Sequence, residues 1–157
     1  MALAEVTSTS LYQHKHWEVE FVQFDDGSNA CLAEVDAGTD SFSVWYYQDD
    51  SFRLQFYSTE WDFGEGQTAD MEVEVDRRGS WSMTGAELYR NSVLFNLPDN
   101  ETGVRFLIEV AQGNQLYLRT AAGEGVKWYS LAGSRASMDA MIQCGEAMTA
   151  TPGNPFN

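Results

Sequence analysis

The chain has 157 residues, a length that favours one domain over two. Apolar residues make up 43% and aromatic residues 13% of the chain, which excludes a long disordered protein, and no apolar run approaches the ~20 residues of a membrane span. Nine Lys and Arg against 24 Asp and Glu give a net charge of −15, which repels phosphate backbones and anionic lipids and so excludes nucleic-acid binding and polybasic docking to a membrane.

Residues 1–14 are predicted to form an N-terminal tail. The segment is polar and rich in Ser and Thr, which is typical of a loose tail or of an edge segment of a sheet. Ala2-Leu3-Ala4 has the small-x-small pattern of a signal-peptidase site, so residues 1–4 are interpreted as a remnant of a signal peptide. The alternative is an ordinary cytoplasmic N-terminus that is rich in alanine.

The two histidines of the chain, His14 and His16, would point the same way on an extended strand. Such a pair can hold a metal ion together with a nearby carboxylate. Lys15 between them would repel the ion, and no third ligand is identifiable in the sequence. We therefore favour two solvent-exposed histidines and predict no metal site.

An alternation of apolar and polar residues begins at Trp17 and predicts two paired strands. Residues 17–22 have the pattern of a half-buried strand, and a second alternation follows from Cys31 to Val35. A turn cluster at 25–29 separates them, so the two strands are expected to form a β-hairpin. The oxygen atoms of this cluster could bind calcium, but its spacing does not match an EF-hand loop, which favours a plain turn.

The next two predicted strands, 42–47 and 52–57, place aromatic residues on both faces in either of two registers. A five-residue loop pairs Tyr46 with Phe52, and the second face then carries Trp45, Tyr47, Arg53 and Tyr57. A four-residue loop pairs Tyr47 with Phe52, and the second face then carries Phe42, Val44, Tyr46, Gln55 and Tyr57. Either a second layer covers this hairpin or an aromatic patch faces solvent. The candidate binding residues are therefore Trp45, Tyr47 and Tyr57.

The remainder of the chain predicts further short strands and two helices. Strands are expected at 71–75, 81–84, 93–97, 116–120 and 126–131. The segment 101–113 is ambiguous, and a short helix is favoured over a strand because of the helical spacing of Val104, Leu107, Ile108 and Ala111. A C-terminal helix is expected to begin at Ser134 or Ser137, with an apolar stripe of Met138, Met141 and Ile142.

These elements predict a mainly β fold. Short antiparallel strands followed by a terminal helix favour a β-sandwich or a squat barrel with one C-terminal helix and a second short helix near 101–112. One domain is expected to span residues 15–146. Residues 147–157 have no periodicity and are expected to form a C-terminal tail.

Cys31 and Cys144 are the two cysteines of the chain. An even number fits one disulfide, which would join the C-terminal helix to the second strand and would indicate an oxidising compartment. The alternative is two buried free thiols. Metal binding and thiol redox chemistry are disfavoured, because no second Cys or His lies at ligand spacing beside either residue and no Cys-x-x-Cys pair is present.

No catalytic constellation is apparent in the sequence, and we predict no cofactor. The chain has no Gly-x-Ser-x-Gly motif, which argues against a serine hydrolase. Glu60 and Asp62 flank Trp61 in a way that could resemble a glycosidase site, but we favour a loop of solvated acids around one Trp. A glycan-acting or metal-dependent enzyme with a surface carboxylate site stays an alternative.

The order of these features resembles the small exported proteins of the invasion-associated locus B type and related alphaproteobacterial proteins of unknown function. The resemblance covers roughly residues 15–146 and rests on three segments: Trp17-Glu18-Val19, Cys31-Leu32-Ala33, and Ser130-Leu131-Ala132-Gly133-Ser134 before a helix that ends at Cys144. It implies an exported β-sandwich with a Cys31–Cys144 bridge and no catalytic residues. The strong acidity of this chain favours envelope or secreted binding over a role in invasion.

Charge and aromatic content together indicate a binding protein. A net charge of −15 with candidate exposed aromatics, Trp128 among them, suits a cationic protein or an envelope component as partner, through electrostatic steering and aromatic anchoring. The alternative is acidity that serves solubility alone. We predict a non-enzymatic, periplasmic or secreted binding protein, with an inhibitor of a basic enzyme such as lysozyme as a narrower alternative.

Overall fold

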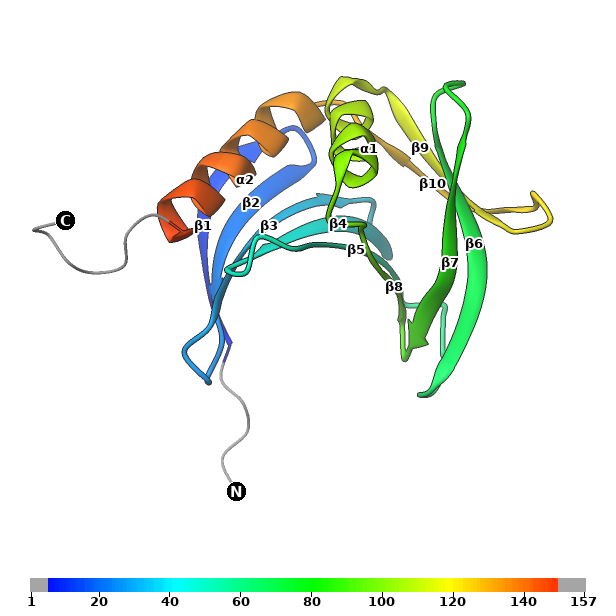
Figure 1. Ribbon diagram of the computed structural model, residues 1–157, viewed down its shortest axis with the longest axis horizontal. Coiled ribbons are helices and arrows are strands. Elements are labelled where there is room, and N and C mark those ends of the chain that lie inside the picture. Colours follow the sequence, from blue (N-terminus) through cyan, green and yellow to red (C-terminus); the bar gives the residue numbers. More distant parts are fainter. Residues whose placement is uncertain (1–5, 150–157) are drawn as a thin grey trace, which may run out of the picture.

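Ten antiparallel strands form one open and strongly curved sheet (Figure 1). The computed structural model describes residues 6–149. The strands are β1 (Thr7–His14), β2 (Trp17–Gln23), β3 (Asn29–Asp36), β4 (Asp40–Tyr47), β5 (Phe52–Ser58), β6 (Gln67–Val75), β7 (Ser80–Tyr89), β8 (Ser92–Asn96), β9 (Gln115–Thr120) and β10 (Gly125–Ser130). Across the sheet they lie in the order β1-β2-β3-β4-β5-β8-β7-β6-β9-β10, so β1 and β10 are its edge strands.

The period-two alternation of the strands separates the concave face of the sheet from its convex face. Trp17 of β2 lies opposite Val35 of β3, and Val19 lies opposite Ala33. All four are buried on the concave face. Because successive side chains of a strand point to opposite faces, the intervening residues, such as Glu18, lie on the convex face.

Both helices cover the concave face (Figure 1). α1 (Glu101–Gln112) begins after Asn100, whose side chain accepts a hydrogen bond from the Thr102 backbone N–H at 2.9 Å. Its Phe106 packs edge to face against Trp81 of β7. α2 (Ser134–Thr149) packs against α1 and across β1 to β4. Within residues 6–149, no helix combines the length and the apolar character that crossing a membrane requires.

A disulfide joins Cys31 of β3 to Cys144 of α2, with their Cα atoms 6.1 Å apart. Both residues are buried. The predicted disulfide is therefore confirmed, and the alternative of two free thiols is wrong. The bond ties the last helix covalently to the concave face of the sheet.

The curvature of the sheet brings its last strand against its middle strands. The ring of Tyr129 on β10 lies 6.0 Å, centroid to centroid, from Phe42 on β4 and equally far from Phe56 on β5. All three rings are buried. Beside them, Lys127 Nζ lies 3.2 Å from a carboxylate oxygen of Asp40. The two halves of the sheet thus face each other as in a β-sandwich, although the sheet is not closed.

The predicted fold class is confirmed. The chain is mainly antiparallel β structure with a C-terminal helix, and the predicted helix near 101–112 is α1. Tyr46 pairs with Phe52, so the five-residue loop gave the correct register for that hairpin. The apolar stripe predicted for α1 is half wrong, because Val104 and Ile108 are exposed. The helix instead buries Gly103, Phe106, Leu107 and Val110.

The boundaries of the domain differ from the predicted ones at both ends. Residues 7–14, predicted as a loose tail or an edge segment, form the edge strand β1, so the sheet begins before residue 15. The backbone of this polar segment pairs with β2, a pairing that needs no apolar alternation. α2 extends to Thr149, into the segment predicted as the C-terminal tail. The predicted signal-peptide remnant at 1–4 and the end of the tail, 150–157, lie outside the described residues.

Candidate binding surface on the convex face

Four carboxylates on β2 and β3 lie together on the convex face. Glu18 of β2 is directly opposite Glu34 of β3 in the register of the two strands. Glu20 and Asp36 follow two residues further along β2 and β3, so strand alternation puts all four on one face. Side chains at directly opposed positions of antiparallel strands lie close enough to interact. We call these four residues, Glu18, Glu20, Glu34 and Asp36, the acidic row.

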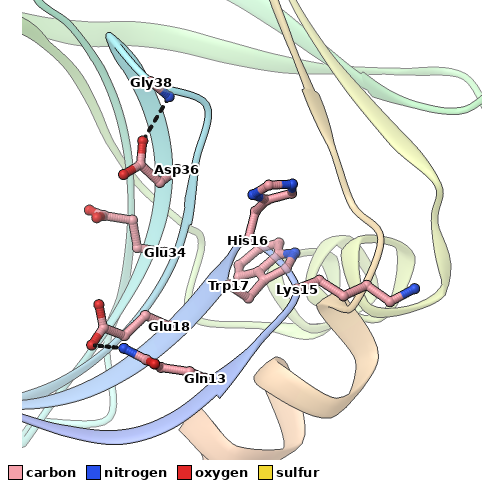
Figure 2. A pocket seen from close by; sticks show the side chains of 8 residues that line it. All are labelled: Gln13, Lys15, His16, Trp17, Glu18, Glu34, Asp36 and Gly38. Atoms are coloured by element: carbon pink, nitrogen blue, oxygen red, sulfur yellow. Dashed lines mark hydrogen bonds between the residues drawn. The ribbon is translucent and has the colours of Figure 1, made fainter.

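Two adjoining hollows lie along three of these carboxylates. The first, of about 440 Å³, extends from the β1–β2 turn past Glu18 to Glu34 and Asp36 (Figure 2). The second, of about 300 Å³, continues from Glu34 and Asp36 across β4 and β5 to Gln55 and Tyr57. In Figure 2 the carboxylates of Glu18, Glu34 and Asp36 point away from the helices. We call the two hollows together the acidic groove.

Three carboxylates of the acidic row accept hydrogen bonds, and none of the four forms an ion pair within residues 6–149, although Lys15 and His16 line the first hollow beside them. Glu34 accepts a hydrogen bond from Ser43 Oγ at 2.9 Å, and Glu18 accepts one from the Gln13 side-chain amide at 3.1 Å. Asp36 accepts one from the Gly38 backbone N–H at 2.8 Å. The ion pairs found within residues 6–149 all involve other acids.

Partial burial and the charges of neighbouring carboxylates raise the affinity of Glu34 and Glu20 for protons. Burial raises the pKa of the Glu34 carboxyl, and the negative charges of Asp36 and Glu18 raise it further, against the opposing hydrogen bond from Ser43. The pKa of Glu20 is raised by burial and by the charges of Glu18 and Glu34. At neutral pH the ionised carboxylates of the row therefore repel one another in the folded protein.

Glu34→Gln is expected to raise the free energy of unfolding at pH 7 by about 0.5–1 kcal/mol, because it removes like-charge repulsion and keeps an acceptor for Ser43. The raised pKa of Glu34 means that the folded protein binds this proton more tightly than the unfolded chain does, so wild-type stability falls as the pH rises through the range in which the carboxyl ionises. The advantage of the variant should therefore shrink between pH 7 and pH 4. Urea denaturation at both values measures it.

Glu124→Gln is the matched control for this prediction, since it removes one negative charge from the exposed turn between β9 and β10. It is expected to leave stability within about 0.5 kcal/mol of the wild type at both pH values. An equal gain for Glu34→Gln at pH 4 and at pH 7 would contradict the argument from repulsion.

The three aromatic residues predicted for binding all lie on the convex face, in two places. Tyr57 lines the acidic groove and is 37% exposed. Trp45 and Tyr47 lie further along β4, where their rings stack with centroids 6.0 Å apart and planes inclined by 7°. Each of these two rings covers one face of the other, and Trp45 Nε1 donates a hydrogen bond to the Gln55 side chain at 2.9 Å. The sequence left open whether a second layer covers this hairpin or an aromatic patch faces solvent, and on its second face Trp45 and Tyr47 are half-buried while Tyr57 is exposed. Their role in binding stays a prediction.

The other candidate residues are those considered for glycan chemistry, for calcium and for another metal ion. Some of them pair with neighbouring side chains, and others lack the ligands that a metal site needs. Glu60 pairs with Lys127, which also pairs with Asp40. Asp26 accepts hydrogen bonds from the Ser28 backbone and side chain, as in an ordinary turn. Throughout residues 6–149 no group of three or more His, Cys, Asp or Glu side chains is arranged to hold a metal ion, His14 and His16 included.

The sequence analysis did not single out the acidic row. The signal was available, because Glu18, Glu20 and Glu34 occupy the polar positions of two strands that were predicted to pair as a hairpin. Aligning the polar positions of that hairpin would have placed these three carboxylates on one face, although not in the observed register. The contribution of Tyr57 to the same groove depends on the positions of β4 and β5 beside β3, which the alternation does not specify.

No protein-family model matches the chain, and searches of curated proteins and of solved structures find no significant match. The resemblance to exported proteins of the invasion-associated locus B type therefore stays a prediction.

Proposed function

We propose that this chain is an exported, non-enzymatic binding protein that holds a cationic partner in the acidic groove. The observation on which the proposal depends is the acidic row itself, in which four neighbouring carboxylates form no ion pair with a basic residue among residues 6–149. Directly opposed like charges destabilise a sheet. A bound cation would remove that cost, so the surface is better suited to a bound partner than to solvent alone.

The groove also offers an aromatic contact to a cation. Tyr57 lines the groove together with Glu34 and Asp36, and more than a third of its surface is exposed. An ammonium or guanidinium group over a Tyr ring gains about 0.5–1 kcal/mol at an exposed site. Carboxylates and a ring in one groove favour lysine or arginine side chains of a protein over a small metal ion.

The disulfide supports the proposed location. Disulfides persist in oxidising compartments, and we propose the periplasm or the cell exterior for this chain. The resemblance to exported proteins of the invasion-associated locus B type agrees with this location. An envelope component or a secreted basic protein is then the expected kind of partner, with a net charge of −15 steering its approach.

Titration calorimetry with a hexalysine peptide tests the proposal. The wild type is expected to bind the peptide with an affinity that falls as salt is added, and Glu18→Gln/Glu34→Gln should weaken binding about tenfold through the loss of two charges in the groove. Asp99→Asn/Glu124→Gln removes the same charge from exposed positions outside the groove and should weaken binding much less. Equal weakening by both double variants would mean diffuse attraction and would overturn the groove as the site.

A further inference from the structure

β1 is an edge strand with an unpaired outer side. It pairs only with β2, and no other strand among residues 6–149 lies beyond it. All but one of its residues are exposed. A strand in this position presents backbone N–H and C=O groups that an added strand can pair with. β1 also lacks Asp, Glu, Lys and Arg, although the chain as a whole is strongly charged.

The opposite edge of the sheet is protected by a paired lysine that β1 lacks. β10 starts at Gly125, and its pairing with β9 is irregular between Gly125 and Lys127. The side chain of Lys127 is bound to Asp40 and Glu60, which holds this edge against the body of the protein. Irregular pairing and lysine are typical means of blocking an edge. The pairing of β1 also shifts between Ser10 and Tyr12, but it is regular on both sides of the shift, over Thr7–Ser10 and Tyr12–His14, and β1 carries no lysine.

The acidic row lies one strand inward from this edge. Ser10 of β1 is opposite Glu20 of β2 on the convex face, and Ser8 is opposite Val22. An eleventh strand beside β1 would lie about 10 Å from β2, at two strand spacings. Because Ser8 and Ser10 are short, a lysine or arginine on such a strand can extend across β1 toward Glu20.

We propose that the β1 edge accepts an extended, basic segment of another protein as an eleventh strand, with lysine or arginine at alternate positions extending over Ser10 toward Glu20 and Glu18. The inference rests on the proposed function and specifies the form of the cationic partner. Backbone pairing supplies affinity in strand addition, and alternate side chains supply specificity. A second copy of this chain is a poor occupant, because each copy carries a net charge of −15.

The experiment uses an octapeptide with lysine at alternate positions and threonine between them. A second peptide of the same sequence, N-methylated at its four central amides, keeps the charge and blocks strand pairing. The first peptide is expected to bind about tenfold more tightly than the second, and amide hydrogen exchange within Thr7–Ser10 should slow about tenfold at saturation.

Two variants of the protein test the position of the added strand. Ser10→Lys should weaken binding of the first peptide about tenfold. Thr84→Lys makes the same change of charge at an exposed position on β7 and should weaken binding less.

Equal binding of the two peptides, with unchanged exchange in β1, would overturn strand addition and leave the acidic groove as a site for cations. Absence of binding by either peptide would overturn the proposed function as well. Slowed exchange in β1 that depends on protein concentration without peptide would show self-pairing, and would overturn the basic segment as the occupant.

Discussion

Replacing Cys31 and Cys144 together by alanine is expected to lower the free energy of unfolding by about 4–5 kcal/mol. The reason is the length of the loop that the bond closes, since the two residues are 113 positions apart. In the chain-entropy account, a cross-link over so long a loop removes many conformations of the unfolded chain. Because whole domains have stabilities of about 5–15 kcal/mol, this loss would leave the protein marginally stable.

Urea denaturation of three samples measures this effect: oxidised wild type, wild type reduced with a thiol, and the double variant. The reduced wild type and the variant are expected to unfold at similar urea concentrations, well below that of the oxidised protein. Cys144→Ala alone should cost about as much as the double variant, because either change opens the loop. Coincident curves for the oxidised and the reduced wild type would contradict the prediction, and would also weaken the argument for an oxidising compartment.

The strands were predicted well where one face is buried, because burial of one face imposes a period of two on the sequence. Trp17, Val19 and their partners on β3 show this. The pattern left two registers open for the next hairpin, and the structure has the one that pairs Tyr46 with Phe52. β1 gave no such signal, since all of its residues except Tyr12 are exposed. Its place in the sheet comes from backbone pairing, which leaves no pattern in the side chains.

The order of the strands in the sheet could not be predicted from the sequence. The alternation of apolar and polar residues indicates which face of a strand is buried, but not which strands lie beside it. Val126–Leu131 was correctly predicted as a strand, but the packing of Tyr129 against Phe42 and Phe56 depends on the curvature of the whole sheet. α1 shows the same limit on a smaller scale. Two apolar stripes with helical spacing share Leu107, and the one that is buried includes Phe106, which packs against Trp81 of β7.

The acidic groove depends both on the alternation of side chains along its strands, which the sequence shows, and on the order of the strands in the sheet, which it does not. Its acids on β2 and β3 follow from a hairpin that the sequence predicted, so the acidic row was within reach of the pattern. Tyr57 was identified as a candidate binding residue from its alternation on β5. That these residues share one groove follows from the pairing of β3 with β4 and of β4 with β5. The site is therefore a product of the sheet, and its sequence signal is divided over several strands.

Gly145→Ala is expected to lower the free energy of unfolding by about 1–3 kcal/mol, although alanine is the better helix former by up to about 1 kcal/mol. Gly145 lies in α2, where a Cβ atom would be 2.9 Å from Cζ of Tyr46 and closer still to Cε2 and Cδ2. The Tyr46 ring is not free to move aside. Its hydroxyl donates a hydrogen bond to Asp50 at 2.8 Å, and its ring lies 4.3 Å from that of Phe52, centroid to centroid.

The helix is equally restrained, because the neighbouring Cys144 is bonded to Cys31. Neither the Tyr46 ring nor α2 can therefore move readily to relieve the overlap with the added Cβ atom. A double-mutant cycle measures the free-energy cost of that overlap. In a Tyr46→Ala background the same Gly145→Ala change should become neutral or stabilising by up to about 1 kcal/mol, since only the helix-propensity gain remains. Gly125→Ala, where an added Cβ meets nothing within 4 Å, is the control and should change urea midpoints little. A destabilisation by Gly145→Ala that is the same with and without the Tyr46 ring would show that the close approach of α2 to β4 is not its cause.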